Sequence, residues 1–215
     1  VFGTFAAAVS MATGAPTFGT PEPSMVIYAA AALARRLGVP FRSGGGLCAS
    51  KLPDAQAAYE SANTLQTAAL AGVNFMLHTA GWLEGGLAMG YEKFIMDCEV
   101  LQMIQRYFEA ATFATTEDDI ATEAIRDVGP SGHYFGTPHT QSRYTTAFYA
   151  PFLADWRNYE AWNIDGAMWT AERAHKMYKA IMAEFVPPEM NGDHQEDLRR
   201  FVAKRKQEGG APTDF

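Results

Sequence analysis

The feature that most constrains the fold is a repeated order of strand, loop and helix in the first third of the chain. Val39–Arg42 has the composition of a short strand, and a glycine-rich loop follows it. Asp54–Ala71 then has the composition of a helix, which ends at Gly72. One such unit, from Val39 to Val73, spans 35 residues. Strands that alternate with helices in this way indicate a parallel sheet or a barrel.

The same patterns predict the other elements. Phe2–Val9 is expected to be the end of a buried strand, and 131–166 an irregular, aromatic-rich lid or wrapping segment. The predicted helices are Ser24–Leu37, Asp54–Ala71, 91–110, one that follows a Thr116/Asp119 capping pair and ends at Val128, Ala167–Phe185, and one capped by Asp193 that runs to about Gln207. The tail after Gln207 is expected to be flexible.

Two apolar stripes are predicted on the central helices. On the helix Asp54–Ala71 the stripe consists of Ala55, Ala58, Ala62 and Leu65. On the helix that starts at Tyr91 it consists of Phe94, Cys98, Leu101 and Phe108. The first set is spaced as one buried stripe, so we expect it to face the core, and the helical spacing of the second set indicates a helix there.

Length and charge restrict the class of protein. The chain has 215 residues, fewer than the roughly 250 of a closed eight-stranded barrel. It starts at Val1 inside an apolar run, so we expect it to be the carboxyl-terminal part of a longer protein. The net charge of −7 argues against a nucleic-acid partner. Two cysteines predict no metal site or disulfide framework, and the absence of an apolar run of about 18 residues predicts no membrane span, which leaves the cytoplasm as the expected location.

Polar side chains follow the next predicted strand, Asn74–Leu77. His78, Trp82 and Glu84 come directly after it, in a stretch rich in glycine. In a parallel sheet or barrel, the loops at the carboxyl ends of the strands carry the chemistry. These three residues are therefore candidates for a site.

Four strings in this order resemble the trimethylamine methyltransferase family (MttB type). They are GTPEP at Gly19–Pro23, SKLPDAQAAYES at Ser50–Ser61, HTAGWLEGGLAMGYEKF at His78–Phe94 and GTPHT at Gly136–Thr140. The resemblance covers nearly the whole chain and implies a TIM-type (β/α)8 barrel, with 1–128 as its carboxyl-terminal βα units. Residues 129–215 would then form an irregular aromatic-rich segment and carboxyl-terminal helices.

The resemblance also implies an activity. Members of the family transfer a methyl group from a methylated amine to Co(I) of a cobalamin-type corrinoid, which a separate corrinoid protein carries. The branch that acts on trimethylamine has pyrrolysine in or near the loop that corresponds to Ser43–Ser50. This sequence has Leu47 and Cys48 in that loop, which places it with the branch that lacks pyrrolysine. Some members of that branch use glycine betaine or related quaternary amines, and we expect a donor of this kind. We expect no cofactor bound tightly by this chain itself.

A quaternary ammonium has no N–H group, so aromatic faces and carboxylates must recognise it. We predict His78 and Glu84 as catalytic residues. The predicted substrate-binding residues are Trp82, Tyr91, His133, Tyr134 and His139. His78 would contact the substrate carboxylate or the corrinoid face, or else be satisfied by backbone carbonyls. Glu84 would balance the ammonium charge, or else accept loop N–H groups, and each aromatic ring would otherwise belong to the core.

Two alternatives remain open from the sequence. Gly44–Gly46, with Arg42 beside it, suits a phosphate cradle, which would favour a barrel lyase or aldolase acting on a phosphorylated substrate. The chain would otherwise be an inactive, truncated barrel fragment. A symmetric homo-oligomer is compatible with the acidic charge and the aromatic-rich segment.

Overall fold

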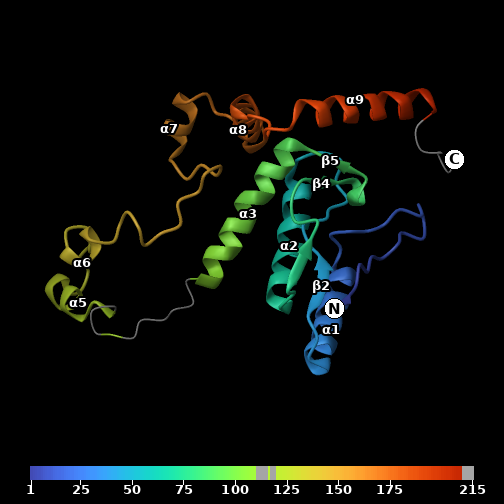
Figure 1. Ribbon diagram of the computed structural model, residues 1–215. Helices are drawn as coiled ribbons and strands as arrows, with labels where there is room; N and C mark the ends of the chain where they lie inside the picture. Colours follow the sequence, from blue (N-terminus) through green and yellow to red (C-terminus); the bar gives the residue numbers. More distant parts are fainter. Residues whose placement is uncertain (110–115, 117–119, 210–215) are drawn as a thin grey trace. The chain divides into compact units, whose positions relative to one another are not determined.

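The computed structural model describes residues 1–109, 116 and 120–209, which have a mixed α/β fold (Figure 1). The chain divides into two compact units, Val1–Lys179 and Ala180–Phe215. The division predicted after Val128 stays a prediction. Asp119 of the predicted capping pair and the tail from 210 to 215 lie outside the described residues.

Three parallel strands form the sheet of the first unit, in the order β1-β2-β3. They are β1 (Phe2–Gly3), β2 (Phe41–Gly44) and β3 (Phe75–Leu77). Phe2 pairs with Phe41, and Arg42 pairs with Phe75. The predicted alternation of parallel strands with helices is therefore confirmed. The strand predicted at Val39–Arg42 lies two residues further along the chain, as β2. The described strands form an open sheet and do not close into a barrel.

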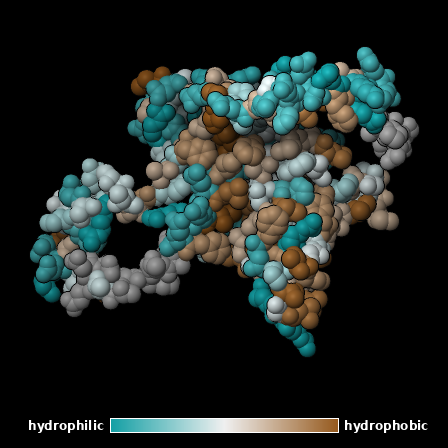
Figure 2. All heavy atoms as spheres, in the orientation of Figure 1, coloured by the Kyte–Doolittle hydropathy of each residue, from teal (hydrophilic) through white to brown (hydrophobic). Residues whose placement is uncertain are grey.

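Helix α1 (Pro21–Leu37) connects β1 to β2 and begins three residues earlier than predicted. Pro21 suits the first helical turn because its fixed φ is helical and its missing N–H would have no partner there. Gly38 ends the helix with φ 64°. The buried face of α1 packs on Phe41 and Ala71. Met25, Leu33 and Leu37 remain exposed. Hydrophobic and hydrophilic atoms lie side by side in the lower part of Figure 2, where Figure 1 places α1.

Helices α2 (Ala55–Ala71) and α3 (Tyr91–Glu109) form as predicted, but the buried stripe predicted on α2 is largely wrong. Only Leu65 of the first stripe is fully buried, and Phe94 and Phe108 of the second are 46% and 48% exposed. The buried residues of α2 are Ala57, Glu60, Ser61, Thr64, Leu65, Thr67, Ala68 and Ala71, and those of α3 are Lys93, Ile95, Asp97 and Glu99. Polar side chains tolerate this burial because they are hydrogen-bonded, as the site below shows.

A small antiparallel hairpin follows β3, where the sequence indicated only a loop. It consists of β4 (Trp82–Leu83), the 3-10 turn η1 (Glu84–Gly86) and β5 (Ala88–Met89). The turn has positive φ angles at all three of its residues, 51°, 64° and 91°. Two glycines make this conformation inexpensive, whereas Glu84 adopts it at a cost in strain.

The remaining residues that the structure describes form helices with irregular connections. The helices are α5 (Thr122–Val128), α6 (Pro138–Gln141), α7 (Tyr159–Ile164), α8 (Thr170–Glu184) and α9 (Gly192–Gln207). The predicted irregular segment thus contains two short helices. Asn191, not Asp193, caps α9, because its side chain accepts the Asp193 N–H at 2.9 Å. Within the part of the chain that the structure describes, no helix combines the length and apolar character that crossing a bilayer requires.

The aromatic-rich segment is anchored to α3 by one buried carboxylate. Glu99 accepts hydrogen bonds from the Tyr149 hydroxyl at 2.6 Å and from the Leu153 N–H at 2.7 Å. Burial and this hydrogen bond raise the pKa of Tyr149. Leu153 also packs with Ile95 and Ala174 in a small core. The segment around 149–153 is therefore fixed against α3.

Candidate active site

Two loops meet where β2 and β3 end, at the edge where the sequence placed the chemistry. The Gly45 N–H donates to the Leu77 carbonyl at 2.9 Å. Gly46 has φ +70°, and a Cβ atom there would lie 2.6 Å from the Thr79 carbonyl oxygen. Only glycine fits at position 46, because the backbone there lies directly against the backbone of His78 and Thr79.

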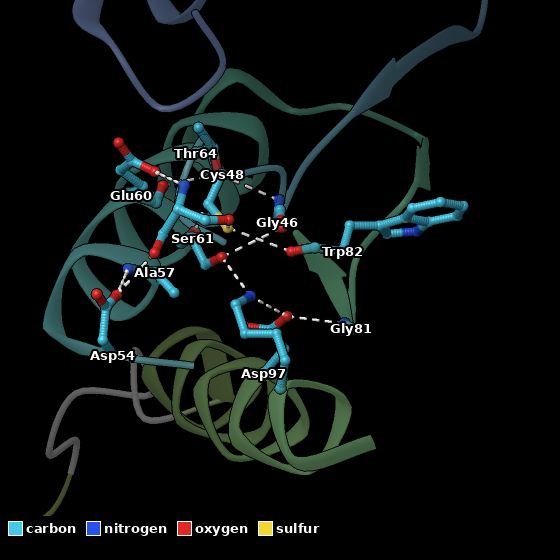
Figure 3. Close-up of polar contacts among 12 residues, drawn as sticks. Gly46, Cys48, Asp54, Ala57, Glu60, Ser61, Thr64, Gly81, Trp82 and Asp97 are labelled. Carbon is cyan, nitrogen blue, oxygen red and sulfur yellow. Dashed lines mark hydrogen bonds and ion pairs between the residues drawn. The ribbon is translucent and has the colours of Figure 1, made fainter. Parts of the chain in front are cut away.

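The hairpin is attached to the same glycine loop, which we define as residues 43–50. The Glu84 N–H donates to the Ser50 carbonyl at 2.8 Å, and the Gly85 N–H to the Cys48 carbonyl at 2.7 Å. The Cys48 thiol donates to the Trp82 carbonyl at 3.2 Å (Figure 3). Burial raises the pKa of this thiol, which opposes formation of the thiolate that a nucleophilic cysteine needs.

A buried polar cluster lies beneath both loops, and we call it the polar floor (Figure 3). It consists of Glu60, Ser61 and Thr64 on α2 and Lys93 and Asp97 on α3. All five side chains belong to residues that are at most 6% exposed. Charged groups are rarely buried to this degree unless they are paired and hydrogen-bonded.

An ion pair forms the centre of the polar floor. The Lys93 ammonium donates to Asp97 Oδ2 at 2.5 Å and to the Ser61 hydroxyl at 2.7 Å. Ser61 donates in turn to the Gly46 carbonyl at 3.1 Å, and Asp97 accepts the Gly81 N–H at 2.8 Å. Burial raises the pKa of Asp97, while the charge of Lys93 acts in the opposite direction. The pair thus connects the glycine loop to the turn before the hairpin.

Glu60 and Thr64 hold the glycine loop from α2. The Glu60 carboxylate accepts the N–H groups of Ala49 at 2.7 Å and Ser50 at 3.3 Å, and the Thr64 hydroxyl accepts the Gly46 N–H at 3.1 Å. A phosphate cradle needs free backbone N–H groups, and these donors are already used. The carboxylate of Glu60 would also repel an anion. The loop therefore does not suit the phosphorylated substrate of the lyase alternative.

His78 and Trp82 lie together as the sequence predicted. Their ring centroids are 5.2 Å apart in an edge-on contact. The ring of His78 also contacts the ring of Phe5, with the centroids 5.0 Å apart. His78 has φ 58°, which is strained for a residue other than glycine. Its Nδ1 atom is buried and has no hydrogen-bond partner among the described residues. The indole of Trp82 points away from the polar floor (Figure 3).

The other predicted site residues make separate contacts. Glu84 is exposed in the hairpin turn, and Tyr91 stacks on Tyr178 with centroids 5.0 Å apart. The His133 ring lies 5.5 Å from that of Phe135, and Tyr134 is 42% exposed. His139 lines a cavity of about 650 Å³ beside α5. Their roles in binding and catalysis stay predictions.

Sequence reasoning missed the polar floor. The spacing of Lys93 and Asp97 by four residues is visible in the sequence, but such pairs usually lie on exposed helix faces. Ser61 and Glu60 lie in one of the strings that carry the family resemblance, and nothing local marks them as buried. No signal in the sequence could have found this cluster, because the exposed positions of Phe94 and Phe108, which leave the inner face of α3 to the charges, are visible only in the structure.

Comparisons with known proteins agree with the resemblance. The family model for trimethylamine methyltransferase (MTTB) matches residues 1–210. A glycine betaine methyltransferase of Desulfitobacterium hafniense (strain Y51) is 44% identical over 98% of this chain and 43% of its own length. A trimethylamine methyltransferase of D. hafniense (strain DSM 10664 / DCB-2) is 31% identical over 89% of the chain and 38% of its own length.

A third relative widens the range of methyl donors. A proline betaine:corrinoid methyltransferase of Eubacterium limosum is 29% identical over 94% of this chain and 42% of its own length. The chain thus spans less than half of the length of these relatives. Because the family model covers nearly all of the 215 residues, the chain belongs to the trimethylamine methyltransferase (MTTB) family.

Proposed function

We propose that the protein containing this chain is a corrinoid-dependent methyltransferase that takes a methyl group from a quaternary amine such as glycine betaine. The acceptor is Co(I) of a corrinoid carried by a separate protein. The observation that carries this proposal is the 44% identity to a glycine betaine methyltransferase, compared with 31% to a trimethylamine methyltransferase from the same species. The name of the proline betaine relative supports both a betaine donor and a corrinoid acceptor.

The proposed architecture is a TIM-type (β/α)8 barrel, of which this chain supplies the carboxyl-terminal units. Three parallel strands in sequential order, joined by α1 and α2, support it. In such barrels the active site lies at the carboxyl ends of the strands. The glycine loop and His78 occupy this position at the ends of β2 and β3.

The side chains after β3 suit a quaternary donor that carries a carboxylate. The indole of Trp82 offers an aromatic face to the ammonium group, which has no N–H to donate. His78, protonated at Nδ1, would donate a hydrogen bond to the carboxylate and so satisfy an atom that lacks a partner among the described residues. Glu84 is exposed, so it would pair weakly with the ammonium group. Weak pairing favours catalysis, because strong ground-state binding of the cation would raise the barrier to losing its charge.

The bond changes of the reaction need little from the protein. The corrinoid would supply the electron pair for the new bond to carbon, and the C–N pair would depart with nitrogen as a neutral tertiary amine. No proton is required for a quaternary donor. The residues of this chain would therefore bind the donor, orient its methyl carbon and exclude water, which is catalysis by positioning.

The test uses the protein expressed from the complete reading frame that contains this chain. With cob(I)alamin or the cognate corrinoid protein, the absorbance of the corrinoid is followed with glycine betaine, proline betaine and trimethylamine. We expect methylation by a betaine and its loss in His78→Ala, but not in the exposed control His194→Ala. Trp82→Leu should raise KM for the betaine about 2-fold to 30-fold, the range of a cation–π contact. Methylation by trimethylamine alone would overturn the quaternary donor, and no methylation by any donor would overturn the function.

A further inference from the structure

The polar floor contains more charge than its packing needs. A buried ion pair contributes little net stability, because removing both groups from water costs about as much as their attraction returns. Well-packed apolar residues would hold α2 against α3 equally well. Packing of α2 against α3 therefore does not explain the hydrogen bonds of Lys93, Asp97 and Ser61.

These hydrogen bonds end on the backbone of two different loops. From Lys93, one branch passes through the Ser61 hydroxyl to the Gly46 carbonyl, and the other passes through Asp97 to the Gly81 N–H. Figure 3 shows one branch ending at Gly46 and the other at Gly81. Gly81 lies between His78 and Trp82 in the sequence, and Gly46 contacts the backbone of His78 and Thr79.

We propose that Lys93, Asp97 and Ser61 are positioning residues for the methyl-transfer site, because they fix the Gly46 backbone relative to the Gly81 backbone. They thereby set where His78 and Trp82 stand against the glycine loop. This inference rests on the proposed function for its catalytic consequence. None of the three contacts the donor, and each acts through the backbone of the loop that does.

The chemistry gives this placement a measurable consequence. A reaction driven by orientation loses rate when the bound donor shifts by about 1 Å, even though every substrate contact is still present. The strained φ of His78 makes the loop sensitive, since it can relax if the support at Gly81 weakens. A network of side chains beneath the loops resists this relaxation without entering the site.

Ser61→Ala tests the proposal with little structural disturbance, because it removes one hydroxyl and leaves the Lys93–Asp97 pair. Thr67→Ala is the matched control: Thr67 lies buried on the same helix and has no place in the polar floor. In the complete enzyme we expect Ser61→Ala to lower kcat/KM for the betaine at least tenfold. We expect the kcat/KM of Thr67→Ala to stay within twofold of the wild-type value, although the Tm of the two variants should fall by a similar amount.

Amide hydrogen exchange provides a second readout that does not depend on activity. We expect exchange in residues 44–50 and 78–84 to be at least tenfold faster in Ser61→Ala and unchanged in Thr67→Ala. If the wild type transfers no methyl group, the proposed function fails and exchange alone decides the positioning role. Activity and exchange of Ser61→Ala both within twofold of the control would overturn the inference. Faster exchange with unchanged kcat/KM would also overturn it, since the loops would then move without consequence for catalysis.

Discussion

Helices α3 and α9 each carry a lysine four residues before an acidic residue, with opposite outcomes. Lys93 and Asp97 are 0% and 2% exposed and 2.5 Å apart, whereas Lys204 and Glu208 are 74% and 42% exposed and 3.7 Å apart. The two pairs are alike in the sequence. The buried pair differs because Lys93 donates a second hydrogen bond to Ser61 and Asp97 accepts one from the Gly81 N–H. Tertiary partners, not spacing, decide whether such a pair enters a core.

The sharpest test of this comparison is to remove one lysine from each pair. Lys93→Met should lower the free energy of unfolding by about 3–5 kcal/mol, because Asp97 would remain buried without its counter-charge. Lys204→Met should change it by less than about 0.5 kcal/mol, since water already solvates Glu208. Urea denaturation of both variants measures the difference. Equal effects would mean that the polar floor is hydrated in solution.

Two glycines with similar backbone angles allow the same comparison without charges. Gly46 and Gly38 have φ +70° and +64°, but a Cβ atom at Gly46 would meet the Thr79 carbonyl at 2.6 Å, while Gly38 has open space around it. We expect Gly46→Ala to cost about 2–4 kcal/mol from the left-handed backbone plus overpacking. Gly38→Ala should cost about 1 kcal/mol from the backbone alone. Thermal unfolding of the two variants measures both losses of stability. Equal losses for Gly46→Ala and Gly38→Ala would contradict the tight contact between Gly46 and Thr79.

The pH dependence of stability shows how far Lys93 compensates the burial of Asp97. Burial raises the pKa of Asp97 in the folded state. A raised pKa gives a contribution to stability that is complete below the unfolded pKa of about 3.9 and is lost as pH rises through the folded pKa. Lys93→Met removes the opposing charge, so its stability should fall more steeply between about pH 4 and 7 than that of the wild type.

The double variant Lys93→Met/Asp97→Asn serves as the control for this titration. The amide introduced at position 97 cannot ionise but can still accept the Gly81 N–H, so the steep dependence should disappear. Its free energy of unfolding should lie about 1–3 kcal/mol above that of Lys93→Met near neutral pH, in keeping with the loss of an uncompensated charge. Urea midpoints at several pH values measure both quantities. Parallel pH curves for the single and double variants would show that Asp97 does not titrate in this range.

The sequence predicted the parts of the fold that depend on local signals. Gly38 and Gly72 end their helices, and β2 and β3 pair in parallel as the alternation required. It failed for the inner face of α2, because apolar spacing was assumed to mark burial. The buried polar residues of α2 and α3 also use partners that are distant in the sequence, such as Gly46 for Ser61 and Tyr149 for Glu99. Local patterns do not contain that information.

For the candidate site, the sequence predicted that residues of the site follow a strand, and their roles in binding and catalysis stay predictions. His78 and Trp82 lie together at the end of β3 because a strand must deliver them there. The hairpin that separates Trp82 from Tyr91 was not predicted, since its strands have only two residues each. Strands so short show no alternation of apolar and polar residues. The stacking of Tyr91 on Tyr178 likewise depends on the packing of α8, which lies far along the chain.

The smallest predicted effect comes from a second carboxylate on α3, and its sign is opposite to that of Asp97. Glu92 accepts a hydrogen bond from His175 at 2.7 Å, which lowers the pKa of the carboxyl. A lowered pKa gives stability that is present above the unfolded value near 4.5 and is lost as pH falls. His175→Ala should therefore reduce stability by less than about 1 kcal/mol at pH 6, because both side chains are partly exposed, and by less still at pH 3.5. The exposed His194→Ala is the control, and urea midpoints at the two pH values measure the change. A larger effect of His175→Ala at pH 3.5 than at pH 6 would contradict this account. The stability contributions of two carboxylates on one helix would change in opposite directions as pH falls, because Glu92 gains a hydrogen bond near water while Asp97 loses its hydration.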